Sequence, residues 1–128
     1  MNAPDELRAL LQRYARAADD RDLGTLEALF HPEAEITGAR GTMPLAEWLG
    51  TMAGPRAFPT SMHMIGEPLI DLDATGTAAT VDSYAVVYQL AADGGTDLTL
   101  GIRYLDETVL ESGRWVIRRR RSETRWMR

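Results

Sequence analysis

The residue whose type and setting most suggest chemistry is His63. It is one of two histidines among 128 residues, and it lies in an apolar stretch, Pro59 to Gly66, that is typical of a strand rather than a loop. Imidazole has an unperturbed pKa of about 6.5, so a small change in its surroundings makes it an effective acid or base near neutral pH. A neighbouring carboxylate would fix its tautomer and raise its basicity. An acid elsewhere in the chain is therefore the partner to expect.

Asp19 is the candidate for that partner. An amphipathic helix is predicted from Pro4 to Asp20, because apolar residues recur at steps of three and four. These residues are Leu7, Leu10, Leu11, Tyr14 and Ala18. Asp19 falls at the border of their stripe, near the end of the helix, and Asp22 is placed to cap a second short helix from Leu23 to Phe30. The same acids could also be solvated turn or cap residues.

The rest of the inventory excludes most other chemistry. The sequence has no cysteine, and all 14 of its basic residues are arginine, so neither a thiol nucleophile nor a lysine Schiff base is available. The histidines lack the spacing of a metal motif, and neither a glycine-rich phosphate loop nor a serine nucleophile elbow is present. We therefore expect no metal and no cofactor. What remains is acid and base catalysis by a carboxylate and an imidazole, unless His63 is simply a satisfied core or surface residue.

Length and charge limit the class of protein. A chain of 128 residues with 45% hydrophobic content is predicted to form a single domain over residues 1–128. The formal net charge of −5 argues against general nucleic-acid binding, which needs a basic surface. No apolar run approaches the roughly 20 residues of a membrane span, and the N-terminus has no export signal. A cytoplasmic protein without nucleic-acid or membrane partners is therefore expected.

Turn-like groups divide the rest of the sequence into elements. His31 to Glu33 is predicted as a turn, Ala34 to Thr37 as a short strand and Pro44 to Met52 as a third helix. Four extended segments joined by glycine-containing turns follow. They run from Ser61 to Asp71, Thr77 to Leu90, Asp97 to Leu110 and Arg114 to Met127. Helices first and one curved, antiparallel sheet afterwards predict an α+β domain with the helices laid across one face of the sheet.

The last of these segments carries four consecutive arginines, Arg118 to Arg121. Strand alternation is expected to divide them between the two faces, with Arg118 and Arg120 on the same one. Most would be solvated or would pair with acids on the neighbouring strand, such as Asp106. One arginine turned into a pocket could anchor a carboxylate or polarise a carbonyl. The long, arginine-rich strand also suggests that a second copy covers part of the sheet's outer face, as a homodimer or homotrimer.

Five motifs, taken in order, carry a resemblance to a known family. They are Tyr14-Ala-Arg-Ala-Ala-Asp19, Leu26-Glu-Ala-Leu-Phe-His-Pro, Ser61-Met-His63-Met, Gly113-Arg-Trp115-Val-Ile and Arg125-Trp126. Over nearly its whole length the chain resembles the SnoaL-like branch of the nuclear transport factor 2-like superfamily. Within that branch it is similar to the scytalone dehydratase and bile-acid 7α-dehydratase group.

This resemblance implies a cone-shaped α+β barrel of the cystatin-like kind, with an apolar pocket under the helices. It also implies that Asp19 and His63 match the catalytic aspartate and histidine of these dehydratases and of the related dehydrochlorinase. Tyr14 matches a tyrosine of the bile-acid enzyme, whose hydroxyl would point at a substrate oxygen. An arginine on the last strand of the dehydrochlorinase falls on Arg120, with Arg125 as a rival.

Several accessory residues of the family are different here. A tyrosine that precedes the aspartate in scytalone dehydratase is Ala18, and a tyrosine on its first strand falls on Gly38. A further polar residue on the second long strand is missing unless Tyr84 or Tyr88 replaces it. The substrates of these enzymes are therefore not transferred to this protein.

The resulting prediction is a cofactor-independent lyase of the dehydratase type, or an isomerase, that acts on a small, largely apolar cyclic or aromatic molecule. His63 would be the base and later the acid, Asp19 would orient it, and Tyr14 would polarise the substrate. Arg120, Trp48 and Tyr88 are the expected substrate contacts, although Trp48 could also be a core residue. The alternatives are a non-catalytic ligand-binding or assembly module of the same fold, and a polyketide-type cyclase.

Overall fold

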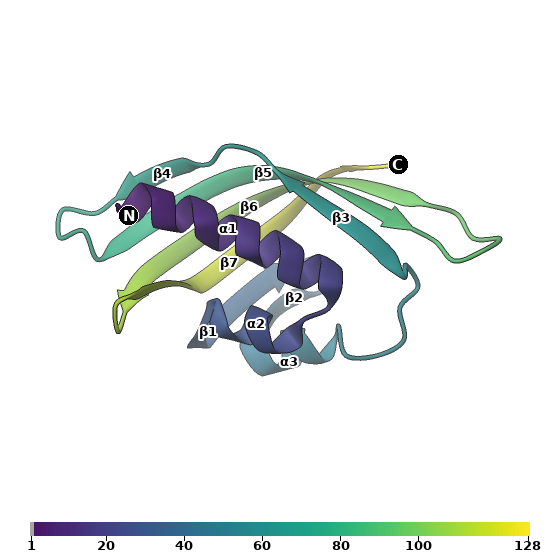
Figure 1. Ribbon diagram of the computed structural model, residues 1–128, viewed down its shortest axis with the longest axis horizontal. Helices are drawn as coiled ribbons and strands as arrows, with labels where there is room; N and C mark the ends of the chain where they lie inside the picture. The colour runs from purple at the N-terminus through teal and green to yellow at the C-terminus, as the bar shows by residue number, and fades with distance from the viewer. Residues whose placement is uncertain (1) are drawn as a thin grey trace.

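In the computed structural model, which describes residues 2–128, the chain forms three helices and seven strands (Figure 1). Helix α1 (Ala3–Asp20) is the longest, and its first turn is capped by the Asn2 side chain, which accepts the Asp5 N–H at 2.9 Å. Helix α2 (Leu23–Ala28) is capped in the same way by Asp22, and α3 (Leu45–Gly50) follows the second strand. The five apolar residues predicted to form the stripe of α1 are all buried, which confirms that prediction.

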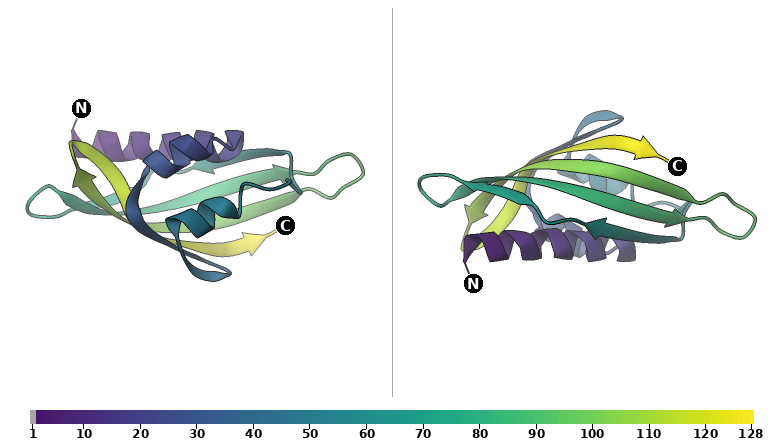
Figure 2. Two further views of the ribbon diagram at one scale, coloured as in Figure 1. Left: turned by 90° about the horizontal axis from the view of Figure 1, so that it is seen from below. Right: turned by 90° about the horizontal axis from the view of Figure 1, so that it is seen from above.

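The strands form one curved, open sheet. They are β1 (Phe30–Gly38), β2 (Gly41–Pro44), β3 (Thr60–Ile65), β4 (Leu69–Leu72), β5 (Ala78–Leu90), β6 (Leu98–Glu111) and β7 (Arg114–Met127). Their order is β2-β1-β7-β6-β5-β3, and β4 also pairs with β5. Every neighbouring pair is antiparallel except β1 with β7, which are parallel. The predicted α+β class and the antiparallel meander of the long strands are therefore confirmed (Figure 2).

Alternation along the long strands separates a buried face from an outer face. In β5 the odd-numbered residues, such as Val81 and Val87, point into the core, where the helices cover the sheet. The outer face carries large apolar side chains that are exposed in the single chain: Met62, Met64, Tyr84 and Tyr88. This is the face on which a second copy was expected, and that expectation stays a prediction.

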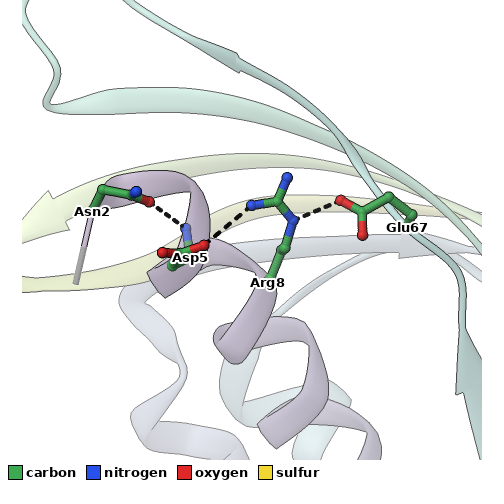
Figure 3. A network of polar contacts seen from close by, with 4 residues as sticks. All are labelled: Asn2, Asp5, Arg8 and Glu67. Carbon is green, nitrogen blue, oxygen red and sulfur yellow. Dashed lines mark hydrogen bonds and ion pairs between the residues drawn. The ribbon is translucent and has the colours of Figure 1, made fainter.

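A polar network joins α1 to the far edge of the sheet. The Arg8 guanidinium donates from Nε to Glu67, which lies between β3 and β4, at 2.6 Å, and its Nη1 lies 3.4 Å from Asp5 on the same helix (Figure 3). All three side chains are substantially exposed, so the network contributes little to stability. The buried apolar stripe of α1 therefore holds the helix against the sheet, where α1 packs on β3.

The predicted turn from His31 to Glu33 is wrong, because these residues belong to β1. The pairing of β1 with β7 shifts register between Phe30 and Glu35, and Pro32 lies inside this irregular part. Proline has no N–H to donate to a strand neighbour, so an irregular position is where it fits. Since β1 already begins at Phe30, α2 ends at Ala28, earlier than predicted.

The predicted strand from Ser61 to Asp71 is divided into β3 and β4. Ile65 pairs with Ala85 and Leu69 pairs with Asp82. Between these two pairs the segment that joins β3 to β4 advances by four residues, whereas β5 advances by three. Pro68 lies in this interruption and cannot donate a ladder hydrogen bond. Helix α3 is also shorter than the predicted Pro44 to Met52. Among the described residues, no helix combines the length and apolar character needed to cross a bilayer.

Candidate active site

Asp19 and His63 lie in direct contact. The Nδ1 atom of His63 is 2.6 Å from Oδ1 of Asp19, and the backbone N–H of His63 donates to Oδ2 of Asp19 at 3.0 Å. Ser61 donates its hydroxyl to Oδ1 of the same carboxylate at 2.9 Å. Both side chains are mostly buried, with 13% of His63 and 18% of Asp19 exposed. The carboxylate is therefore held by three donors from one strand.

Two local features create this contact. Ser61 and His63 are two residues apart on β3, so strand alternation points both side chains to the inner face. Helix α1 ends at Asp20, and the next residue, Arg21, adopts the left-handed conformation with φ of 53°, so that its backbone N–H caps the helix carbonyls. Asp19 thus stands in the last turn of α1, directly against β3.

The hydrogen bonds fix the protonation state of the pair. Burial lowers the pKa of the His63 imidazole below its usual value of about 6.5, and this outweighs the hydrogen bond and the negative charge of Asp19, which act to raise it. The imidazole is therefore neutral near pH 7. Asp19 already accepts from Ser61 and from a backbone N–H, so the tautomer of His63 with its proton on Nδ1 gives this carboxylate a third donor. The Nε2 atom is left with a free lone pair.

Tyr14 and Arg120 lie next to the pair. The ring of Tyr14 meets the His63 ring edge to face, with 5.9 Å between the centroids. The guanidinium carbon of Arg120 lies 4.1 Å from the centroid of Tyr14 and 4.1 Å from that of Tyr104. Burial raises the pKa of Tyr104 well above its usual range, so this phenol keeps its proton. The Arg120 cation therefore lies against the rings of Tyr14 and Tyr104, and the Tyr14 ring in turn contacts the imidazole of His63.

Arg120 is fully buried, and Asp106 on β6 neutralises it. Its Nε and Nη2 atoms donate to the two carboxylate oxygens of Asp106 at 2.7 and 2.8 Å. Burial acts to lower the pKa of Arg120, but the charge and hydrogen bonds of Asp106 outweigh this and raise it, so the guanidinium is permanently charged. The Nη1 atom is buried without an acceptor. It is the one nitrogen of this group that remains to bind a substrate oxygen.

The predicted distribution of the arginine run is wrong for Arg118 and Arg120. At a bulge, the two steps from Ile117 to Arg119 of β7 lie opposite the single step from Thr108 to Glu107 of β6. Ile117 and Arg120 therefore both face the core, whereas Arg118 is exposed. Arg125, the rival for this role, is also exposed.

A cavity of about 230 Å³ opens beside these side chains. Its polar lining includes Tyr14, Ser61, His63 and Arg120, and its apolar wall includes Ile36, Trp48, Met52 and Ile102. Trp48 also packs on Phe30 with 5.2 Å between ring centroids, so it serves the core and the cavity together. Larger hollows of about 550 and 650 Å³ lie around α2 and Arg114, but neither His63 nor Asp19 lines them.

Tyr88, expected to contact the substrate, does not line this cavity and is 45% exposed on the outer face. The alternation of β5 points the next residue, Gln89, into the cavity instead. Sequence reasoning also missed Ser61, Tyr104 and Arg21 as members of the site. For Ser61 a signal was available, because a residue two positions before an inward-facing histidine on a strand shares its face.

Comparisons with known proteins identify the family of this chain. The profile of the SnoaL-like domain matches residues 1–121, and the chain belongs to this family. Relatives at 30% identity over 121 residues are uncharacterised proteins of Mycobacterium tuberculosis and Mycobacterium bovis, in which the alignment covers 90% of this chain and 80% of the relative.

Solved structures define the fold more closely. A scytalone dehydratase-like protein of Novosphingobium aromaticivorans is 23% identical, with a TM-score of 0.88 over 97% of this chain and 85% of its own. A hexachlorocyclohexane dehydrochlorinase of Novosphingobium barchaimii is 13% identical, with a TM-score of 0.82 over 97% and 87%. An NTF2-like protein with a cystatin-like fold, also from Novosphingobium aromaticivorans, is 22% identical, with a TM-score of 0.81 over 94% and 80%. These likenesses confirm the predicted NTF2-like, cystatin-like fold.

Proposed function

We propose that this protein is a cofactor-independent lyase of the dehydratase type, or an isomerase, in which His63 is the general base. The observation that carries the proposal is the Asp19 to His63 hydrogen bond of 2.6 Å, because His63 also lines a cavity to which Ile36, Trp48 and Met52 contribute apolar surface. A pair facing bulk solvent, or a filled cavity, would instead have supported a non-catalytic module. The names of the dehydratase and the dehydrochlorinase among the structural neighbours support the same reaction class.

The catalytic role of each residue follows from the atoms that remain available to contact a substrate. The lone pair of Nε2 takes a proton from a carbon next to a carbonyl, while Asp19 stabilises the imidazolium that forms. The enolate oxygen that develops is stabilised by Nη1 of Arg120 and by the hydroxyl of Tyr14, since both side chains line the cavity. The proton then passes from Nε2 to the leaving hydroxyl on the next carbon, which departs as water. If no leaving group is present, the proton returns to another carbon, and the outcome is isomerisation.

The size of the cavity limits the substrate. An apolar cavity of about 150 Å³ holds one benzene molecule. The 230 Å³ beside His63 therefore suits one substituted ring, and a fused steroid-sized ring system would have to extend beyond it. Trp48 and Met52 supply an apolar surface against which such a ring would pack. The substrate proposed is a small, single-ring carbonyl compound.

A β-hydroxy cyclohexanone tests this proposal, because its dehydration gives a conjugated enone whose absorbance is easily followed. The same protein should also exchange the α-protons of cyclohexanone for deuterium in heavy water. We expect both reactions with the wild-type protein and a loss of roughly 10²- to 10⁴-fold with His63→Ala. His31→Ala is the matched control and should retain full activity. Equal rates for the His63→Ala and wild-type proteins would remove His63 from the mechanism.

A further inference from the structure

Two half-buried arginines, Arg21 in the cavity lining and Arg56 in the loop before β3, have no acidic partner. Within residues 2–128, four arginines are buried or half-buried: Arg21, Arg56, Arg103 and Arg120. Arg103 donates two hydrogen bonds to Asp82, and Arg120 donates two to Asp106. Over residues 2–128, neither Arg21 nor Arg56 makes an ion pair within 4.0 Å. Because acidic residues outnumber basic ones and the net charge is −5, two half-buried arginines without an acidic partner are unexpected.

The unpartnered atoms are donors withdrawn from solvent. The Nε atom of Arg21 and the Nε and Nη2 atoms of Arg56 are buried without an acceptor. A buried donor without a partner costs free energy, and for a charged group the cost is larger than for a neutral one. Guanidinium cannot escape this cost by losing its proton, because its pKa lies far above neutral pH. Three donor nitrogens that belong to two permanent cations are thus left without an acceptor.

The two cations also repel each other. Burial and, after it, the positive charge of Arg56 lower the pKa of Arg21. Asp19 attracts Arg21 weakly, but its oxygens already accept from Ser61 and His63, so it does not satisfy the guanidinium. A bound anion would accept the free donors and remove the repulsion at the same time.

The position of the pair connects it to the reaction. Arg21 caps the C-terminal end of α1, two residues after Asp19, and its side chain lines the same cavity as His63. Arg56 comes from the loop of residues 51–59, which leads into β3. The other arginine of the cavity lining, Arg120, is already neutralised by Asp106 and has one free nitrogen. The uncompensated positive charge at the cavity is therefore that of Arg21, and the charge of Arg56 acts on Arg21 as well.

We propose that Arg21 and Arg56 bind a carboxylate carried by the substrate, so that the protein acts on a single-ring carboxylic acid. This inference rests on the proposed function for the statement that the ligand is a substrate. The carboxylate accepts from both guanidinium groups, and the ring extends along Trp48 toward His63. The same chemistry could also be supplied by a free inorganic anion, and the two sources differ in whether the ring contributes to binding.

Benzoate and its neutral isostere benzamide test the assignment. The protein has only two histidines, so the ring signals of His63 in proton NMR spectra report on the cavity and those of His31 serve as the internal reference. We expect benzoate to shift the His63 signals and not the His31 signals. We expect benzamide to bind at least about tenfold more weakly, because it lacks the charge that the two arginines would pair with. Equal affinity for the two compounds, or no shift at His63 with benzoate, would overturn the proposal.

The arginine variants assign the charge. The double substitution Arg21→Gln and Arg56→Gln is expected to weaken benzoate binding by at least about tenfold and to leave benzamide binding unchanged. Arg13→Gln removes an exposed arginine of α1 and should leave both affinities unchanged. Unaltered benzoate binding by the double variant would overturn the proposal. Since Arg21 caps α1 in a left-handed conformation, Arg56→Gln alone is a second test that leaves the helix end intact.

Sodium sulfate distinguishes a substrate group from a free anion. If sulfate displaces benzoate with an affinity equal to that of benzoate itself, the ring contributes nothing and the substrate assignment is wrong. We expect sulfate to compete at least about tenfold more weakly. All these measurements are of binding, so they do not depend on turnover. If His63→Ala kept full activity, the proposed function would be wrong, but the benzoate result would still stand. If the protein bound benzoate no better than benzamide while activity still depended on His63, only the carboxylate site would be wrong.

Discussion

Two aspartates on the inner side of the sheet are each bound by a basic partner, and the two pairs differ in one respect that matters for chemistry. Asp106 and Arg120 are fully buried, with 0% and 1% of their side chains exposed, whereas Asp19 and His63 keep 18% and 13%. Each carboxylate has both oxygens occupied. Guanidinium cannot release its proton near neutral pH, but imidazole can.

The difference shows that the permanent charge of Arg120 and the exchangeable proton of His63 are held by two separate pairs. Asp106 holds the permanent cation of Arg120 against the rings of Tyr14 and Tyr104, and Arg120 also contributes to the cavity lining. In the other pair, His63 lines the same cavity and Asp19 holds its Nδ1 atom, so a ligand in the cavity would meet an imidazole that can exchange a proton. Breaking each pair by the same conservative change, aspartate to asparagine, should therefore affect different properties.

The largest effect is expected for Asp106→Asn. The substitution keeps the shape of the side chain but leaves the Arg120 charge buried and uncompensated, which typically costs about 3–5 kcal/mol of stability. Urea denaturation followed by circular dichroism measures this loss. Glu107→Gln is the control at the next position, where an exposed pair with Arg119 contributes about 1 kcal/mol or less. Equal, small losses for both variants would show that Arg120 finds another partner or reaches water.

Asp19→Asn should reduce turnover and preserve the fold. Asparagine can still accept the backbone N–H of His63, but its amide would then donate to Nδ1, which moves the ring proton to Nε2 and removes the lone pair of the base. We expect a loss of roughly 10²- to 10³-fold in kcat, within the range that a general base contributes. The rate of enone formation from a β-hydroxy cyclohexanone measures it.

Asp20→Asn is the matched control for that change, because Asp20 is the adjacent acid, is exposed and makes no side-chain hydrogen bond within the described part of the chain. Its kcat should equal that of the wild-type protein. If Asp19→Asn were as active as this control, the pair would be structural, like Asp106 with Arg120.

The two pairs should also respond differently to pH. The folded pKa of His63 is lowered, so below about 6.5 the unfolded chain binds a proton that the folded protein resists. The contribution of His63 to stability is therefore present above about pH 6.5 and is lost as pH falls through the lower, folded pKa. Turnover should follow the same direction, since only the neutral ring is a base. NMR titration of the His63 ring signals gives the pKa, and a value above 6.5 would show that Asp19 outweighs burial.

The two pairs were not equally predictable from the sequence. Asp19 with His63 could be expected, because helix periodicity placed Asp19 at the end of α1, strand alternation gave His63 one face, and the resemblance to the dehydratases joined them. The acid on β6 was foreseeable only as one possible partner of several arginines. Which arginine enters the core depends on a bulge after Ile117, and a bulge leaves no period in the sequence that could reveal it.

The same limit explains the errors at the cavity. A shift of one residue along a strand exchanges its faces, and this is why Gln89 occupies the place expected for Tyr88. Arg21 and Arg56 lie in a helix cap and a loop, where no periodicity applies, so the effect of the Arg56 charge on the pKa of Arg21 follows only from the structure. Alternating strands and apolar helix faces were thus predictable, whereas bulges, caps and loops were not.

The smallest effect is expected for Ser61→Ala, which removes one of the donors that hold Asp19. A hydrogen bond of this kind contributes about 1 kcal/mol, so kcat should fall by roughly fivefold and remain well above that of Asp19→Asn. Because Oδ1 of Asp19 would then accept only from His63, the carboxylate charge should act more strongly on the ring and raise the His63 pKa. Ser122→Ala, which also alters a serine of the cavity wall but not a donor to Asp19, should change neither value. A loss of kcat without a rise in that pKa would mean that Ser61 contacts the substrate rather than positioning Asp19.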